Sequence, residues 1–146
     1  SSYVMSEILA ANLYNNIKNF KKIQIKRSKI WNFYFYGLAE WAKQNNVKLP
    51  NLSQQSSHSS HLFYLIFPSK KKLKHFVLYM QKKKIQVASH YLPLNKSKFY
   101  KKRYKKNITL INSENFSETL IRLPLYYNLN LANQKKIINE INKYDV

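Results

Sequence analysis

The sequence lacks cysteine altogether and contains only one glycine, Gly37, and one aspartate, Asp145. Without cysteine, neither disulfide bonds nor thiolate metal sites can form. No apolar run approaches the roughly 20 residues that a membrane-spanning helix requires, and the N-terminus has no signal-peptide pattern. A chain of 146 residues has the length of one domain, and about two-thirds of its unfolded surface can be buried. These absences predict a globular domain in the cytoplasm.

Negative charge is also scarce. The 26 lysine and arginine residues outnumber the 6 acidic residues and give a net charge of +20. Only Arg27, Arg103 and Arg122 are arginine, although bidentate phosphate binding and base readout favour arginine over lysine. Lysine, asparagine, isoleucine and tyrosine all have A/T-rich codons, so a biased genome that produces a solvated lysine surface explains this composition. A basic nucleic-acid-binding module, with residues 96–106 as its contact, is the alternative that the charge leaves open.

Apolar periodicity predicts two consecutive helices in the first third of the chain. Ser6 is a suitable N-cap for the first helix, with Glu7 in the first turn, where a carboxylate suits the helix dipole. The second helix covers about residues 20–43, with apolar side chains at three- and four-residue intervals and lysines on the other face. The apolar stripes consist of Ile8, Leu9, Leu13 and Ile17 in the first helix and Ile23, Ile30, Trp31, Tyr34, Leu38 and Trp41 in the second.

The remaining two thirds of the chain predict short helices and short extended segments. Residues 61–67 form an aromatic and β-branched run typical of a buried strand, which Pro68 ends. Ser69 and Asn130 are suitable caps for the two longer helices. The full series is an extended segment at 47–50, a loop at 51–60, a helix at 70–83, a strand at 85–90, a mobile basic loop at 95–107, a helix at 113–121, an extended turn at 123–129 and a last helix after 130. These elements predict an α+β domain with helices packed on one face of a small, mostly antiparallel sheet.

Four motifs occur in a fixed order along the chain. They are Ser-Glu-x-x-Ala-Ala from Ser6, His-x-Phe-Tyr from His61, His-Tyr-x-Pro-Leu from His90, and Leu-Pro-Leu-Tyr-Tyr-Asn-Leu from Leu123. In order and spacing they resemble the DegT/DnrJ/EryC1/StrS sugar aminotransferase family, and the resemblance covers nearly all of the chain. It implies the C-terminal small domain of a fold-type I pyridoxal-phosphate-dependent transferase. Residues 1–45 would then be a helical linker from a large cofactor domain that this chain lacks, and residues 46–146 the small domain.

The family resemblance also implies an activity and its partners. The expected enzyme is a homodimer that uses pyridoxal 5'-phosphate to transfer an amino group from glutamate to the 4-keto carbon of a dTDP-4-keto-6-deoxyhexose. In this family the Schiff-base lysine and the aspartate at the pyridine nitrogen lie in the large domain. None of the 23 lysines here matches the Schiff-base motif, so we expect the chain alone to be inactive and not to hold the cofactor. A gene remnant that folds without activity is a further alternative.

The same resemblance implies four site residues. His90, Tyr91 and Asn95 correspond to the loop that closes over the nucleotide sugar in the family, and we expect them to bind substrate. Asn95 stands where the family usually has histidine, and an amide could still donate a hydrogen bond there. Ser2 stands where many members have an asparagine that reaches the cofactor phosphate of the neighbouring subunit, and a serine hydroxyl can donate to the same oxygen. Read without the family, His90 is a hydrogen-bonded histidine at a capped strand end and Ser2 is a frayed terminus.

We predict no metal site. His58 and His61 are three residues apart, but they lie on a serine-rich loop without neighbouring carboxylates. A metal ion needs three or four ligands that converge on one point.

Overall fold

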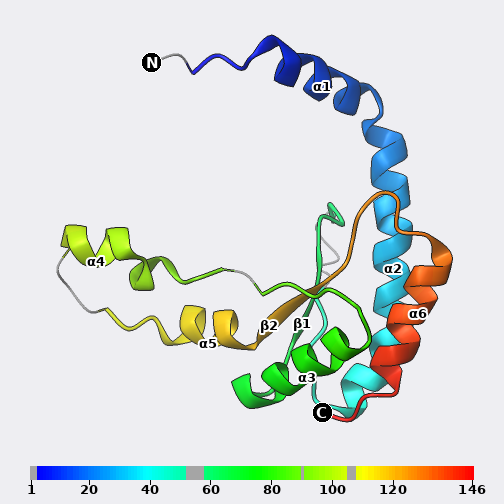
Figure 1. Ribbon diagram of the computed structural model, residues 1–146, viewed down its shortest axis with the longest axis vertical. Helices are drawn as coiled ribbons and strands as arrows, with labels where there is room; N and C mark the ends of the chain where they lie inside the picture. Colours follow the sequence, from blue (N-terminus) through cyan, green and yellow to red (C-terminus); the bar gives the residue numbers. More distant parts are fainter. Residues whose placement is uncertain (1–2, 52–57, 90, 105–107) are drawn as a thin grey trace.

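The long helix α2 (Phe20–Gln44) supplies a large part of the core, and α6 (Leu131–Asn142) packs along it (Figure 1). The computed structural model describes residues 3–51, 58–89, 91–104 and 108–146. Three aromatic residues in the second half of α2 are buried and also donate hydrogen bonds to distant carbonyls. Trp31 donates to Leu62 at 3.1 Å, Tyr34 to Pro124 at 2.9 Å and Trp41 to Tyr144 at 2.7 Å. The predicted helix at 20–43 is therefore confirmed, and its polar aromatic tips fix three separate segments of the chain.

The sheet is small and antiparallel. Strand β1 (Phe63–Ile66) pairs with β2 (Leu120–Leu123), with Phe63 opposite Leu123. Single antiparallel bridges extend this pair on both sides, from Lys48 to Ile66 and from Ala88 to Arg122. Alternation places the odd-numbered side chains of both strands in the core, while Tyr64 and Arg122 point to the other face. The predicted antiparallel sheet is confirmed.

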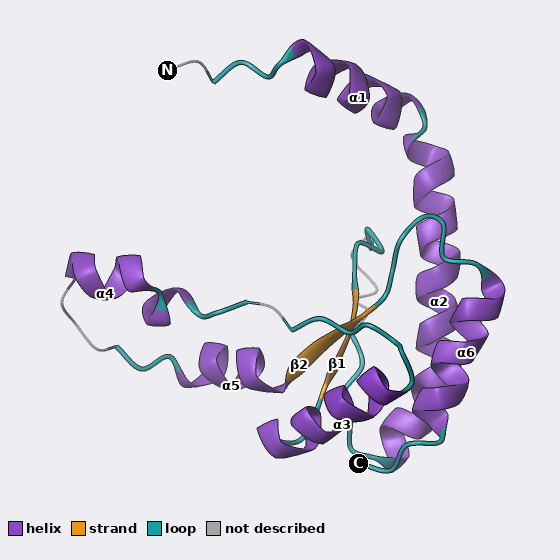
Figure 2. Ribbon diagram, viewed as in Figure 1, coloured by secondary structure: helices purple, strands orange, loops and turns teal. Residues whose placement is uncertain are grey.

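Helices α2, α3 (Lys70–Lys82) and α6 (Leu131–Asn142) supply the core that covers the inner face of the sheet (Figure 2). In α2 the buried residues follow the predicted stripe from Ile30 to Trp41. Both predicted caps are present, because the Ser69 hydroxyl accepts from the Lys72 amide at 3.3 Å and the Asn130 side chain accepts from the Asn133 amide at 2.8 Å. The α+β class is confirmed.

The single glycine lies where α2 and α6 pack side by side (Figure 1). A Cβ atom at Gly37 would lie 2.7 Å from Cδ1 of Ile138 and 3.3 Å from its Cγ2. These distances are closer than van der Waals contact allows. The absence of a side chain at Gly37 therefore sets how closely the two helices approach.

Two helices are followed by a residue in the left-handed conformation, a position that glycine usually occupies. After α2, Asn46 has a φ of 53°, and the amide of Val47 donates at 2.9 Å to the helix carbonyl five residues back. After α3, Lys84 has a φ of 58°, and the amide of Ile85 makes the equivalent bond at 2.9 Å. Each is a Schellman motif, which satisfies the last helix carbonyls and reverses the chain. Val47 and Ile85 are buried, so the two reversals return the chain to the core.

Two arms extend from this body (Figure 1). One is α1 (Glu7–Lys18), which begins at the predicted cap, since Ser6 accepts from the Leu9 amide at 3.4 Å. The other consists of α4 (Lys98–Tyr104) and α5 (Ile111–Thr119). Neither α1 nor α4 has a buried residue in the described part of the chain. The apolar stripe predicted for α1 is therefore present but exposed.

Three predicted elements are wrong in part. The strand predicted at 85–90 is reduced to the bridge at Ala88, because the Schellman motif takes up Ile85. The loop predicted at 95–107 contains helix α4, in which Tyr100 and Tyr104 stack one turn apart at 4.8 Å. The helix predicted at 113–121 begins at Ile111 and ends at Thr119, because the next residues pair with β1. Residues 52–57 of the predicted loop at 51–60 lie outside the described residues.

Candidate functional site

The predicted site residues fall into two groups. Ser2 and His90 lie outside the residues that the structure describes. Tyr91 and Asn95 are described and have opposite environments, since Tyr91 is 76% exposed and Asn95 is 6% exposed. The Tyr91 ring lies over the guanidinium of Arg122, with Cζ 5.8 Å from the ring centroid. Arg122 projects from β2, so this contact ties the segment after Ala88 to the outer face of the sheet.

A hollow of about 560 Å³ opens beside Tyr91. Its walls come from the outer face of β1 and β2 and from α5. The rings of Tyr64 and Phe116 meet edge to face there, with centroids 6.3 Å apart. Asn112, Ser113, Ser117 and Arg122 add polar groups to a mainly apolar lining. A pocket of this kind suits an organic ligand that is held by apolar contacts and oriented by a few polar groups.

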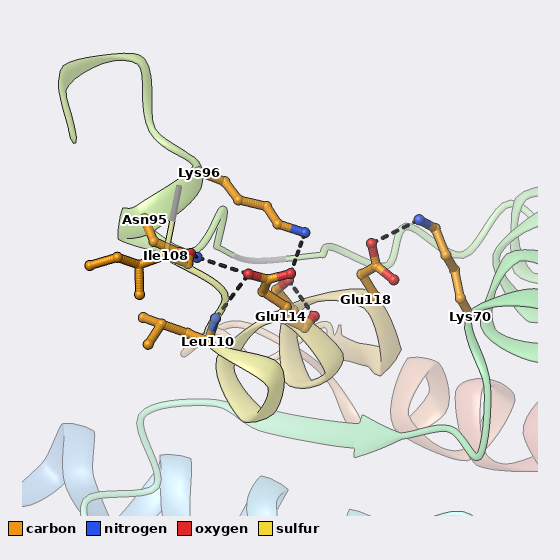
Figure 3. A network of polar contacts seen from close by, with 8 residues as sticks. Lys70, Asn95, Lys96, Ile108, Leu110, Glu114 and Glu118 are labelled. Atoms are coloured by element: carbon orange, nitrogen blue, oxygen red, sulfur yellow. Dashed lines mark hydrogen bonds and ion pairs between the residues drawn. The ribbon is translucent and has the colours of Figure 1, made fainter. Parts of the chain in front are cut away.

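Asn95 belongs to a network centred on Glu114 (Figure 3). The Asn95 amide donates to the Ile108 carbonyl at 2.7 Å and to Oε1 of Glu114 at 2.8 Å. The same Oε1 accepts from the Leu110 amide at 3.1 Å, and Lys96 pairs with Oε2 at 2.7 Å. The hydrogen bonds from Lys96, Asn95 and the Leu110 amide lower the pKa of Glu114 to about 2. The network joins α5 to the segment before α4 and so fixes the base of this arm.

This geometry limits what Asn95 can do for a ligand. Both hydrogens of its amide nitrogen are engaged within the chain, so the hydrogen bond that we expected it to donate to a ligand is already used. Its Oδ1 is buried and has no hydrogen-bond partner among the described residues. Oδ1 is therefore the one side-chain polar atom of Asn95 left to accept from a ligand, and because it is buried the surrounding segment would have to move to expose it.

Two lysines with shifted pKa values can be compared with what a pyridoxal-phosphate site requires. A Schiff-base lysine needs a lowered pKa to act as a nucleophile, whereas ion pairs with Glu140 and Glu114 raise the pKa of Lys83 and Lys96. The only aspartate in the sequence is Asp145, which is exposed. Neither Lys83 nor Lys96 therefore fits the role of a Schiff-base lysine.

Metal ligands do not converge in the part of the chain that the structure describes. The Nδ1 atom of His58 accepts from the Ser60 amide at 2.9 Å, and its ring packs on Trp31 with centroids 4.6 Å apart. His61 contacts Arg27 instead. No helix among the described residues is both long enough and apolar enough to cross a membrane.

Sequence reasoning did not single out Glu114 or Phe116. Glu114 is one of 6 acidic residues in a chain of net charge +20, and that scarcity is the signal that could have found it. Phe116 had no such signal, because its contact with Tyr64 forms across 52 residues of sequence only once β1 and α5 are in place.

Comparison with known proteins gives one family and one fold. The sequence pattern of the DegT/DnrJ/EryC1/StrS aminotransferase family matches residues 1–142. Similar solved structures include Helicobacter pylori PseC, an aminotransferase involved in the biosynthesis of pseudoaminic acid (21% identity, TM-score 0.76, 89% of this chain and 34% of that chain). Another is S. venezuelae DesV in complex with a ketimine intermediate (21% identity, TM-score 0.78, 92% of this chain and 35% of that chain). A third is a DegT DnrJ EryC1 StrS aminotransferase from Brucella abortus (23% identity, TM-score 0.76, 98% of this chain and 39% of that chain).

The chain spans about a third of the length of the solved structures that it matches. Its fold is that of the C-terminal small domain of such enzymes, as the sequence predicted.

Proposed function

Because this chain belongs to the DegT/DnrJ/EryC1/StrS aminotransferase family, we propose that it is the C-terminal part of a pyridoxal-phosphate-dependent sugar aminotransferase. The observation that carries the proposal is the family match over residues 1–142, on a fold that corresponds to a third of such enzymes. The boundary at residue 45 between a linker and the small domain belongs to the same proposal. In the structure, the second half of α2 shares the core of the small domain.

In this proposal a large N-terminal domain holds the cofactor. The bound cofactor would supply the electron sink for amino transfer. This chain, which does not hold the cofactor and is inactive alone, would form a wall of the substrate cleft and part of a homodimer interface. Tyr91 and the hollow beside it would contact the sugar, His90 would donate or accept a hydrogen bond there, and Asn95 would offer Oδ1. Ser2 would donate to the cofactor phosphate of the other subunit.

We further propose a nucleotide-sugar substrate. The segments Ser-Ser-Tyr at the start and Leu-Pro-Leu-Tyr-Tyr-Asn-Leu from Leu123 resemble the dTDP-4-amino-4,6-dideoxygalactose transaminase of enterobacterial common antigen synthesis. The amino acceptor would be a dTDP-4-keto-6-deoxyhexose and the amino donor would be glutamate. The product would be a precursor for polysaccharide biosynthesis, and the reaction would take place in the cytoplasm. A nucleic-acid-binding module and an inactive remnant are not favoured.

The test uses an enzyme assembled from this chain and a family large domain. His90→Ala and Tyr91→Ala should lower turnover of the nucleotide sugar about tenfold to a hundredfold, since a lost directed hydrogen bond costs about 1–3 kcal/mol. The melting temperature and the cofactor spectrum should not change. Leu78→Ala, at an exposed position of α3 that does not line the hollow, is the control and should leave turnover unchanged. A variant that melts earlier but turns over normally per folded molecule would remove both residues from the site.

A further inference from the structure

A second hollow, of about 580 Å³, has a markedly cationic rim. Arg27, Lys84, Arg122 and Lys136 line it, and no acidic residue is among its lining groups. Arg122 lies between the two hollows, because it also lines the hollow beside Tyr91. These four cations come from α2, the C-terminal end of α3, β2 and α6. They are therefore brought together by the fold and do not belong to one lysine-rich run of the sequence. Two of the three arginines in the sequence are among them. Because 23 of the 26 basic residues are lysine, the presence of two arginines in one hollow distinguishes it from the rest of the basic surface.

The Arg27 guanidinium is fixed by hydrogen bonds to His61, and its Nε donor has no partner among the described residues. Its Nη2 donates to the His61 carbonyl at 2.6 Å and lies 3.0 Å from Nδ1 of His61. A guanidinium has no acceptor, so Nδ1 accepts this bond. Its Nε is buried and has no hydrogen-bond partner among the described residues. A buried charged donor without an acceptor is costly, so a shift of the Arg27 side chain that brought Nε to an anion in the hollow would be favourable.

The other cations are placed by backbone that is itself fixed. The amide of Arg122 donates to the Ala88 carbonyl at 2.9 Å, and the Ala88 amide donates back at 3.1 Å. Lys84 is the left-handed residue of the Schellman motif after α3. Ile85 and Ile137 add apolar surface between the cations. The cations therefore stand around an apolar floor on rigid elements.

We propose that this hollow binds a phosphate group. A phosphate carries up to two negative charges and several acceptor oxygens, which matches a rim of two arginines and two lysines better than a single carboxylate would. The inference rests on the geometry of this chain and does not depend on the aminotransferase assignment.

The test uses the whole chain, with its arginine side chains as reporters. Because there are only three arginines, the Nε–H region of a 1H–15N NMR spectrum holds at most three arginine signals, which Arg→Lys variants assign. The titrant is inorganic phosphate, at about 150 mM NaCl to screen long-range attraction to the net charge. We expect the Arg27 and Arg122 signals to follow one saturating curve. Arg103, on α4, should not follow that curve and serves as the internal control.

Matched charge variants then locate the binding. Lys136→Gln should weaken phosphate binding about two- to fivefold, as expected for one partly solvated ion pair. Lys135→Gln removes the same charge from the neighbouring residue of α6, which does not line the hollow, and should change affinity less than about twofold. Lys84→Gly should also weaken binding while raising thermal stability, because glycine relieves the left-handed backbone. Its effect on binding therefore cannot come from unfolding.

Phenyl phosphate separates two sources of the group. Tighter binding of phenyl phosphate than of inorganic phosphate assigns the hollow to a phosphorylated organic ligand that also uses the apolar floor, and equal affinity assigns it to free phosphate. The proposal is overturned if all three arginine signals drift together without saturation. It is equally overturned if Lys135→Gln weakens binding as much as Lys136→Gln.

Discussion

Glu114 is the residue on which the α4–α5 arm depends most. Its carboxylate accepts from Asn95 and from the Leu110 amide and pairs with Lys96 (Figure 3). The family resemblance pointed to Asn95 as a ligand contact, whereas the structure shows that the amide of Asn95 holds the chain together. Asn95 can have both the structural role and the ligand contact only if the ligand binds to Oδ1. The function of Asn95 therefore depends on the conformation of this arm.

Glu114 should make stability depend on pH at the acid end. Its pKa in the folded chain is about 2, below the ordinary value of 4.5, so the folded state favours the ionised form. The contribution of the ionised Glu114 carboxylate to the free energy of unfolding is complete above about pH 4.5 and is lost as the pH falls toward 2. Urea denaturation of the wild type and of Glu114→Gln should therefore differ at neutral pH and converge near pH 2. A constant difference across this range would show that the charge of Glu114 contributes nothing to stability.

At the scale of elements, two helix ends reverse through left-handed residues other than glycine. Lys84 has a Cβ atom that the left-handed conformation crowds, at a cost of roughly 1–2 kcal/mol. Asn46 is a residue type that tolerates this conformation better. In this chain, which has one glycine, asparagine and lysine therefore occupy the left-handed positions where glycine is usual.

Lys84→Gly should raise the free energy of unfolding by about 0.5–1 kcal/mol. This figure is the relief of left-handed strain less the extra chain entropy that glycine loses on folding. Lys82→Gly, two residues earlier and helical, is the control and should lower the same quantity by about 1 kcal/mol. Urea denaturation measures both. Equal effects of the two substitutions would show that Lys84 is not strained.

The contact between α2 and α6 makes a second prediction for packing. Gly37→Ala should lower the free energy of unfolding by about 1–3 kcal/mol, because its Cβ would lie 2.7 Å from Cδ1 of Ile138. In an Ile138→Val background, which removes that methyl group, Gly37→Ala should be neutral or stabilising through its helix propensity. A double-mutant cycle measures this coupling. If Gly37→Ala has the same effect in both backgrounds, the glycine does not set the helix separation.

The helices were more predictable from the sequence than the strands. Caps such as Ser69 and stripes such as the one from Ile30 to Trp41 are local, and the structure confirms them. The start of strand β2 was wrongly predicted as helix, because Leu120 and Ile121 are extended only through pairing with β1, which lies more than 50 residues earlier. Arg27 was missed as a site residue for the same reason, since its partner His61 is 34 residues away.

For the whole molecule, the two arms carry much of the apolar surface that the described chain leaves exposed. On α1, Ile8, Leu13 and Ile17 are exposed, and on the other arm Phe99 and Phe116 are exposed. Exposed apolar side chains concentrated on extended segments are typical of contact surfaces. In the proposed enzyme, α1 and Phe99 would face the large domain or the second subunit, whereas Phe116 lines the hollow beside Tyr91.

The central claim is that this chain supplies the small domain of an aminotransferase and that another domain holds the cofactor. Absorbance spectroscopy with pyridoxal phosphate, followed by borohydride reduction and peptide mapping, tests it most directly. The chain alone should give no stoichiometric band and only scattered labelling of its surface lysines. Addition of a family large domain should produce a bound-cofactor band, and reduction should fix the cofactor to a lysine of that domain. A stoichiometric band from this chain alone, fixed to one of its own 23 lysines, would contradict the claim.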